Sequence, residues 1–313
     1  MDFGRGAIIK KLRIVVSLPN DNRYQHAQAV AAKAAGDRLG VDLQVLQADD
    51  DAIIQSQQLL ELVQSRSESR PDAVVAEPVT GTGLRRVAQT AVAAGIAWVI
   101  SNSDVDYVGE LRKTSSVPVF AVSQGQTEVG RIQGKQISAL LPDGGSVLYI
   151  QGPSTSSVSQ RRNDGMESTK PHNVQIRTLR SKWSEENAYQ AVSSWLRLAV
   201  ARAENFDLIA GQTHELALGA RKAFQDHKDN AQRARWLSLP FIGIGIRSHT
   251  QPLVDRRTLT AAVITSLTMQ LALEMLVRAM ETQIRPPEHT LVELSSYPSL
   301  EKLAEHNKVL EKP

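Results

Sequence analysis

His214-Glu215 is the pair of residues in this sequence that most resembles a catalytic motif. A helix with His-Glu and a second His four positions after the first binds zinc on one face, and the glutamate acts as general base. Position 218 is Leu, so the second zinc ligand is missing. The other histidines are dispersed, with no Ser or carboxylate partner at a telling spacing. The sequence therefore predicts no metal site on this helix.

Glycine and serine motifs of common enzymes are also incomplete. Gly81-Thr-Gly83 lacks the third glycine and the lysine of a phosphate-binding loop, and is typical of a turn before a helix. No Gly-x-Ser-x-Gly nucleophile elbow occurs. Where a dinucleotide-binding fingerprint would follow the first strand, the sequence has Ser17-Leu-Pro-Asn20. We predict a protein that is not an enzyme, with no catalytic residues and no cofactor.

Composition indicates a globular protein with a substantial core. Of 313 residues, 42% are hydrophobic and 22% charged, which is ordinary for one large or two medium domains. The net charge is +3, but Lys and Arg are scattered along the chain, so we predict no binding of nucleic acid. The absence of cysteine excludes disulfides and thiol chemistry, and fits an oxidising or a reducing compartment.

Targeting and membrane segments are not evident in the sequence. No apolar stretch approaches the roughly 18 residues that span a bilayer, so no membrane insertion is predicted. The segment from Met1 to Lys11 carries several charges and no apolar core, and so is not a secretory signal as written. Two localisations remain open: cytoplasmic if Met1 is the native start, or exported if a leader was replaced by Met1.

The regular elements alternate along the whole chain. Short β-branched runs predict strands at Leu12–Ser17, Val41–Gln47, Ala73–Ala76, Ala97–Ser101, Val117–Val122, Ser146–Gln151, Asn173–Thr178, Phe206–Ala210, Phe241–Ile244, Thr258–Ile264 and Thr290–Leu294. Ala- and Leu-rich stretches predict helices between them, including Tyr24–Leu39, Ala52–Ser65, Leu84–Ala94, Ser184–Ala203, His214–Asp226, Ser266–Thr282 and Ser299–Val309. This alternation predicts an α/β fold whose parallel sheets bind ligands at the carboxyl ends of their strands.

A second strand–helix series begins near Val117, which suggests two lobes. Ser123-Gln-Gly-Gln126 has the pattern of a capping box, and predicts a helix that begins after Ser123 and runs to about Leu141. Another helix is expected from about Ser156. No long Ser/Gly or Pro linker separates the two series, so we expect the lobes to join through several tight crossings.

The order and spacing of several segments resemble the type I periplasmic binding proteins, in particular the ribose-binding-like branch that is shared with the effector-binding cores of LacI-type repressors. The similar segments are Leu12–Gln25, Asp72–Val79, Ala94–Ser101, Gln151–Ser154, Gln160–Gly165 and Glu215–Ala220. The resemblance extends from about Leu12 to Leu294. It implies two Rossmann-like lobes, parallel sheets flanked by helices, joined by a three-crossing hinge with the ligand cleft between them. The implied lobes are residues 11–121 plus 266–289 and residues 122–265 plus 290–313.

The same resemblance implies a set of ligand-binding residues. They are Asn22, Tyr24, Glu77, Asn102, Arg162, Trp183, Thr213, His214, Gly245 and Thr265. An aromatic ring such as that of Tyr24 can lie on the apolar face of a sugar, and the guanidinium of Arg162 presents five donors in a rigid fork. Each has a structural alternative: Asn22 as a helix cap, Arg162 as a surface residue at a helix start, and Trp183 as a core residue.

Several of these positions depart from the pattern of sugar binders. Asn102 stands in place of an Asp, Thr213-His214 in place of Asn-Asp, Gly245 in place of an Asp and Thr265 in place of a Gln. Because carboxylates bond hydroxyls more strongly than neutral groups do, these changes predict weak binding of ribose and galactose. A less hydroxylated or partly charged ligand is expected instead.

The resemblance leaves two functions open. The first is a binding protein for a sugar, polyol or related small molecule, which closes on its ligand by hinge motion and serves an ABC permease or a membrane sensor; the family implies a periplasmic location. The alternative is a cytoplasmic effector-binding regulatory domain of LacI-like type. Only about ten residues precede the first strand, too few for a helix-turn-helix, so this chain itself is not expected to bind DNA.

Overall fold

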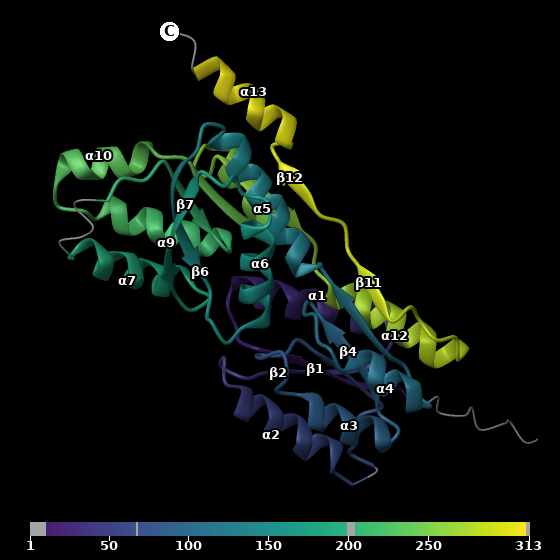
Figure 1. Ribbon diagram of the computed structural model, residues 1–313. Helices are drawn as coiled ribbons and strands as arrows, with labels where there is room; N and C mark the ends of the chain where they lie inside the picture. Colours follow the sequence, from purple (N-terminus) through teal and green to yellow (C-terminus); the bar gives the residue numbers. More distant parts are fainter. Residues whose placement is uncertain (1–10, 67, 199–203, 311–313) are drawn as a thin grey trace, which may run out of the picture. The chain divides into compact units, whose positions relative to one another are not determined.

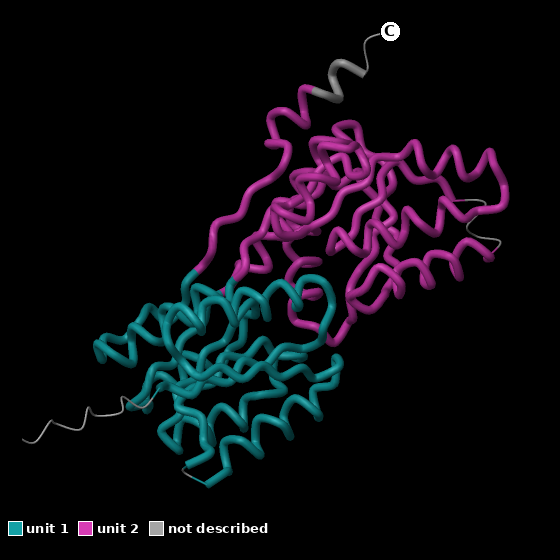
Figure 2. The backbone as a smooth tube through the Cα atoms, turned by 180° about the vertical axis from the view of Figure 1, so that it is seen from behind, with its two compact units in different colours: residues 1–122, 268–290 teal, residues 123–267, 291–313 magenta. Residues whose placement is uncertain are grey.

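Two units make up the described chain, and the chain passes between them three times. The computed structural model describes residues 11–66, 68–198 and 204–310. Unit 1 comprises residues 1–122 and 268–290, and unit 2 comprises residues 123–267 and 291–313 (Figure 2). The crossings therefore lie at 122/123, 267/268 and 290/291.

Unit 1 is built on a six-stranded sheet in the order β11-β5-β4-β3-β1-β2. Its strands are β1 (Arg13–Leu18), β2 (Asp42–Gln47), β3 (Ala73–Ala76), β4 (Ala97–Ser101), β5 (Val119–Ser123) and β11 (His289–Leu291). The pairs from β2 to β5 are all parallel. The inner strands β3 and β4 are buried throughout, which explains their continuous apolar runs.

Helices cover both faces of the unit 1 sheet (Figure 1). They are α1 (Arg23–Leu39), α2 (Ala52–Val63), α3 (Arg85–Ala93), α4 (Val108–Thr114) and α12 (Met269–Thr282). α2, α3 and α4 share one core cluster with the strands, and it includes the fully buried Trp98 and Tyr107. α1 and α12 pack on each other and against the strands of the other face.

Unit 2 repeats the same strand order in its own sheet, β12-β10-β9-β8-β6-β7. Its strands are β6 (Gly145–Gln151), β7 (Val174–Arg180), β8 (Leu208–Gly211), β9 (Phe241–Ile246), β10 (Ala261–Thr265) and β12 (Ser295–Tyr297). β12 is antiparallel to β10, and the other pairs are parallel. Two parallel-sheet units flanked by helices confirm the predicted fold class.

The helices of unit 2 form two layers with separate cores. They are α5 (Gln126–Leu140), α6 (Ser157–Glu167), α7 (Glu185–Leu196), α9 (His214–Gln225), α10 (Asn230–Ser238), α11 (Arg247–Asp255) and α13 (Leu300–Leu310). α5, α6 and α13 bury one face of the sheet. α7, α9 and α10 bury the other around an aromatic cluster, in which Trp236 stacks on Phe224 with ring centroids 4.9 Å apart.

The predicted capping box at Ser123 is wrong. Ser123 is the last residue of β5, and its hydroxyl accepts from the amide of Gly125 at 3.1 Å. Gly125 is the N-cap of α5 and has φ +64°, a left-handed conformation that glycine adopts at little cost. This turn displaces the helix start to Gln126, so the Gln126 side chain is not needed for a cap.

Three further predictions of local structure need correction. α4 and α10 were not expected, because α4 has seven residues and α10 buries only Trp236 along a polar sequence. The strand predicted at Thr290–Leu294 overlaps only β11, and β12, which follows in the other sheet, was not expected. The helix predicted at Ser184–Ala203 is observed as α7, which ends at Leu196, and residues 199–203 of that prediction lie outside the described residues.

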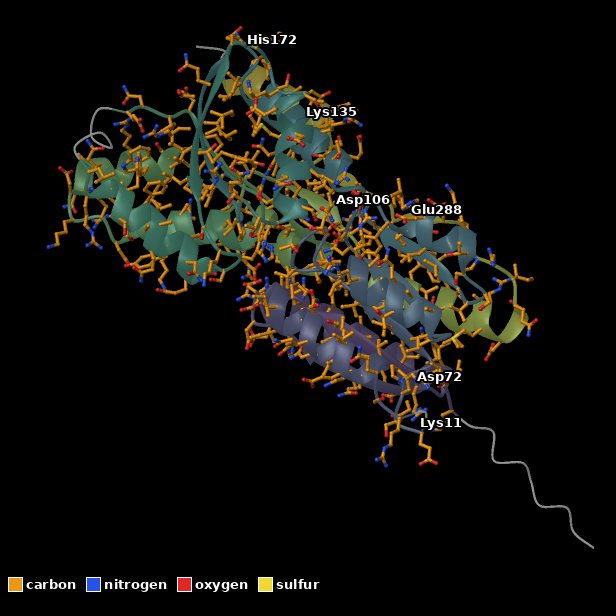
Figure 3. The ribbon with its side chains drawn as sticks, turned by 60° about the horizontal axis from the view of Figure 1, so that its bottom comes forward. Lys11, Asp72, Asp106, Lys135, His172 and Glu288 are labelled. Atoms are coloured by element: carbon orange, nitrogen blue, oxygen red, sulfur yellow. The ribbon has the colours of Figure 1, made fainter. Side chains whose placement is uncertain are left out.

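The helices of residues 11–66, 68–198 and 204–310 include no candidate for a segment that spans a bilayer. The exposed side chains of Lys135 and His172 lie on the surface of unit 2 (Figure 3).

Candidate functional site

A buried carboxylate lies at the carboxyl end of β3 in unit 1. The Glu77 side chain is 4% exposed, and its Oε1 accepts from Gln25 Nε2 at 2.9 Å and from Asn102 Nδ2 at 2.8 Å. Gln25 lies on α1 and Asn102 follows β4, so three segments meet at one oxygen. We call Gln25, Glu77 and Asn102 the Glu77 cluster. It joins two residues predicted from the sequence, Glu77 and Asn102, through a third that was not predicted.

The backbone around the Glu77 cluster is held by further amides. Gln55 Nε2 of α2 donates to the carbonyl of Glu77 at 2.9 Å, and Gln55 Oε1 accepts from the amide of Val79 at 2.9 Å. Asn102 has φ +55°, a conformation that Asn tolerates better than most residues. Gln55 therefore ties the loop after β3 to α2 on both sides of Pro78.

Asn22 and Tyr24 lie at the start of α1, near the carboxyl end of β1. Asn22 Oδ1 accepts from the amide of Gln25 at 2.9 Å, so the helix-cap alternative for Asn22 is observed. The Tyr24 hydroxyl accepts from Gln28 Nε2 at 2.8 Å. The cap places Gln25 in its position in the Glu77 cluster, so Asn22 is connected to that cluster through one residue.

In unit 2, the side chain of Arg162 is held by two neutral acceptors. Arg162 is 6% exposed; its Nε donates to Gln126 Oε1 at 2.8 Å and its Nη1 to the carbonyl of Gln212 at 2.7 Å. Gln212 also donates to the carbonyl of Ser159 and accepts from the amide of Gly152. The surface alternative for Arg162 is therefore wrong. Gln126, Arg162 and Gln212 form what we call the Arg162 cluster.

Glycines set the position of Arg162 by letting α5 and α6 approach closely. A Cβ on Gly130 would lie 2.1 Å from the carbonyl oxygen of Arg162, and a Cβ on Gly165 would lie 1.9 Å from that of Thr127. Both distances are shorter than any real carbon–oxygen contact, so only glycine fits either position. The backbone of α6 that carries Arg162 is consequently in direct contact with α5.

Two other predicted side chains of unit 2 also pack on glycines. The Trp183 ring lies against Gly152, where a Cβ would be 2.3 Å from the ring, and it also packs on the core beneath α7 and α9. His214 is 2% exposed, and a Cβ on Gly245 would be 2.6 Å from its Nδ1. Trp183 is thus half-buried and packs on Gly152 and on that core, and Gly245 makes room for an imidazole.

The remaining predicted residues of unit 2 end strands or begin a helix. Thr213 is the N-cap of α9, and its hydroxyl accepts from the amide of Leu216 at 3.2 Å. Thr265 is the last residue of β10 and is 3% exposed. Like the unit 1 residues, these lie at the carboxyl ends of parallel strands, where such sheets bind ligands.

Sequence reasoning missed the residues that support these side chains. Gln25, Gln126 and Gln212 complete the two clusters, and the ring of His249 lies 5.6 Å from that of His214. Gln212 directly precedes Thr213 after a predicted strand, so its position was a usable signal. Gln25 and Gln126 lie on helices, and nothing local distinguishes them from solvated glutamines.

A buried tyrosine is bonded to the residue that precedes Gln212 of the Arg162 cluster, through one glutamine. The Tyr149 hydroxyl donates to Gln133 Oε1 at 3.2 Å, and Gln133 Nε2 donates to the carbonyl of Gly211 at 2.8 Å. Burial raises the pKa of Tyr149 well above its usual range. The phenol therefore stays neutral and acts as a hydrogen-bond donor to Gln133.

Both clusters offer groups that bind polar ligands. Carboxylate and amide oxygens accept from hydroxyls or amines, and guanidinium and amide nitrogens donate to ligand oxygens. Among the described residues, no three His, Asp or Glu side chains are grouped so as to hold a metal ion. The arrangement suits non-covalent recognition of a small polar molecule.

Comparison with known families gives one match that extends over most of the chain. Residues 14–283 match the family described as a periplasmic binding protein domain. A comparison with curated proteins found no match.

Several solved structures share the fold at low sequence identity. An ABC transporter solute-binding protein from Bacillus halodurans with bound myo-inositol has a TM-score of 0.77 and 16% identity, and the alignment covers 96% of this chain and 99% of that one. One from Mycobacterium smegmatis with bound glycerol has a TM-score of 0.76 and 20% identity, over 95% and 96%. The fructose-binding periplasmic domain of a hybrid two-component system has a TM-score of 0.75 and 16% identity, over 96% and 95%.

Proposed function

The chain belongs to the periplasmic binding protein domain family, and on that premise we propose that it binds one sugar-like or polyol ligand with residues of both units. The observation that carries this proposal is the pair of buried polar clusters at the carboxyl ends of the two sheets. One supplies a carboxylate and the other a guanidinium, each held by amides. Preorganised groups of this kind bind hydroxyls without having to be ordered first.

The proposed contacts are the predicted loop residues. In unit 1 they are Asn22, Tyr24, Glu77 and Asn102, and in unit 2 they are Arg162, Trp183, Thr213, His214, Gly245 and Thr265. A ligand that contacts both units favours the conformations in which both contacts are made. It thereby shifts the population of the chain toward a closed form, which a partner can distinguish from the open one.

The partner that reads the closed form is proposed to be a membrane protein. Similar structures come from ABC transporters and from a two-component sensor, so the partner is an ABC permease or a membrane sensor. The bound ligands recorded for those relatives are myo-inositol and glycerol, and one relative is described as fructose-binding. We propose a polyol or a partly charged sugar for this chain. Gly245 and Thr265 supply no carboxylate or amide, so ribose and galactose should bind weakly.

The test is a thermal-shift screen against myo-inositol, glycerol, ribose, galactose, sugar acids and nucleosides at millimolar concentration. A ligand at about 100 times its Kd stabilises the folded chain by about 2.7 kcal/mol, enough to raise the Tm by a few degrees. Arg162→Lys should abolish the shift, because an ammonium does not reproduce the bonds of Nε and Nη1 to two acceptors. Arg161→Ala, at the exposed neighbouring position, is the matched control.

Two results would count against the proposal. One is a panel in which no compound raises the Tm. The other is a ligand whose shift survives both Arg162→Lys and Glu77→Gln, since that ligand would bind elsewhere. Sub-micromolar binding of ribose or galactose by calorimetry would contradict the narrower statement about ligand class and leave the binding function intact.

A further inference from the structure

Gln28 of α1 bonds three different groups with one buried side chain. It is 0% exposed; its Nε2 donates to the Tyr24 hydroxyl at 2.8 Å and to Thr268 Oγ1 at 3.0 Å. Its Oε1 accepts from the amide of Met269 at 3.1 Å. Tyr24 belongs to the proposed ligand contacts, whereas Thr268 is the first residue of unit 1 after the second crossing. One amide therefore connects Tyr24 with the crossing.

The bond to Met269 replaces a cap that α12 does not provide for itself. Met269 is the first residue of α12, and the first amides of a helix have no acceptor within it. The N-cap residue Thr268 makes no side-chain cap bond. Gln28 supplies the acceptor from another helix, so the start of α12 depends on a residue 241 positions earlier in the chain.

Thr268 has a second connection to the same site. Its hydroxyl, 0% exposed, lies 2.7 Å from the hydroxyl of Ser101 at the end of β4. The next residue is Asn102, which donates to Glu77 in the Glu77 cluster. The residue that follows the crossing is thus bonded to the first turn of α1 through Gln28, and to the end of β4 through Ser101.

We infer that Gln28 is a positioning residue that couples Tyr24 to the second crossing, so that a ligand that moves Tyr24 changes the hydrogen bonding at Thr268 and Met269. Buried amides are costly to leave without partners, so the side chain responds as a unit when one of its three bonds changes. The part of this inference that concerns a ligand rests on the proposed function. The coupling within unit 1 does not, and it can be measured without a ligand.

The first experiment uses the ligand-free full chain and follows hydrogen exchange of the Met269 amide by NMR. Gln28→Met removes the acceptor and should speed this exchange at least tenfold. Tyr24→Phe removes the hydroxyl that accepts from Gln28 Nε2, and should speed exchange of the Met269 amide at least threefold. The amide of Leu276, in the middle of α12, is the internal reference for global opening. Gln58→Met, which removes a side-chain bond to Gln47 elsewhere in unit 1, should leave Met269 unchanged.

The second experiment is a double-mutant cycle on the Kd for myo-inositol. Tyr24→Phe and Gln28→Met should each weaken binding about fivefold, and together no more than the stronger of the two, since both interrupt one connection. If Tyr24 only contacts the ligand, the two losses of binding free energy would add, and the double variant would bind about 25-fold more weakly.

The outcomes separate this inference from the proposed function. If Tyr24→Phe leaves the Met269 exchange rate within experimental error of the wild type, the coupling is wrong, whatever the ligand. If the exchange responds while no compound of the panel binds, the proposed function fails and the coupling stands. Additive losses in the cycle would overturn the ligand-dependent part.

Discussion

The polar side chains at the carboxyl ends of the two sheets are held by different means in unit 1 and unit 2. In unit 1, Glu77 is fixed by bonds between side chains from three segments. In unit 2, Arg162 is also hydrogen-bonded, to Gln126 and Gln212, but the backbone that carries it is set by glycines, because α5 and α6 touch where a Cβ would stand at Gly130 or Gly165. The same strand order therefore supports two different ways of building a rigid site.

This difference determines what each site tolerates. A hydrogen-bonded cluster loses a bond when a side chain changes, while its backbone remains in place. The contact between α5 and α6 accepts no added methyl group at Gly130 or Gly165, because the atoms that would clash belong to the backbone. Unit 2 should therefore be the more sensitive to small-to-large substitutions, and unit 1 to the removal of polar atoms.

The largest expected effect is that of Gly165→Ala in unit 2. The new Cβ would lie 1.9 Å from the carbonyl oxygen of Thr127, so α5 and α6 must separate and Arg162 must move. We expect a loss of stability of about 3 kcal/mol and loss of ligand binding. Urea unfolding and the thermal-shift assay would measure both.

Gly109→Ala in unit 1 is the matched control. Its Cβ would lie 2.8 Å from Oε1 of Glu288, the end of a flexible exposed side chain that can turn away (Figure 3). Alanine is the better helix former, so this variant should be neutral or slightly more stable. Equal losses of stability for Gly165→Ala and Gly109→Ala would contradict the difference between the two units.

A smaller effect is expected from Glu77→Ala in unit 1. Gln25 and Asn102 would each lose a buried acceptor, with a cost of about 2 kcal/mol in urea unfolding. Glu77→Gln keeps one oxygen and should cost less than half as much. Glu110→Ala removes an exposed glutamate that pairs with Arg85, and should change stability by less than about 0.5 kcal/mol. A Glu77→Ala variant as stable as Glu110→Ala would show that the cluster does not hold the site.

The strands were the part of the fold that sequence predicted best. β3 and β4 were predicted to the residue, since their apolar runs reflect burial on both faces. α10 was missed because a surface helix with one buried residue, Trp236, has no apolar periodicity. The cap of α5 was misplaced because a left-handed Gly125 competes with Ser123 for the start of the helix, and both patterns are present in the sequence.

The candidate site was predictable only in part, for a different reason. Strand ends place Glu77, Asn102 and Thr265 at the carboxyl edges, so their general location follows from alternation alone. Their support depends on contacts between distant segments: Gln126 meets Arg162 across 36 residues. The requirement for glycine at position 165 depends on how closely two helices pack. No local pattern contains such information.

The smallest effect concerns a feature that the two units share. Asp51 caps α2 of unit 1 by accepting from the amides of Ile53 and Ile54, and Asp229 caps α10 of unit 2 by accepting from those of Ala231 and Gln232. The starts of α2 and α10 are therefore stabilised in the same way, although they belong to different units.

Asp229→Asn isolates the charge in such a cap, since asparagine still accepts the bonds. Hydrogen bonds from the amides of Gln232 and Ala231 lower the pKa of Asp229, so the folded chain binds its proton less readily than the unfolded chain does. The wild type should thus have the higher Tm above about pH 4, the range of an unfolded carboxyl, and its advantage should disappear as the pH falls through the lowered value. Thermal scans of the wild type and of Asp229→Asn from pH 2 to 7 would measure this difference. A Tm difference between wild type and Asp229→Asn that stays constant over that range would mean that the cap acts through its geometry alone, as a backbone contact does.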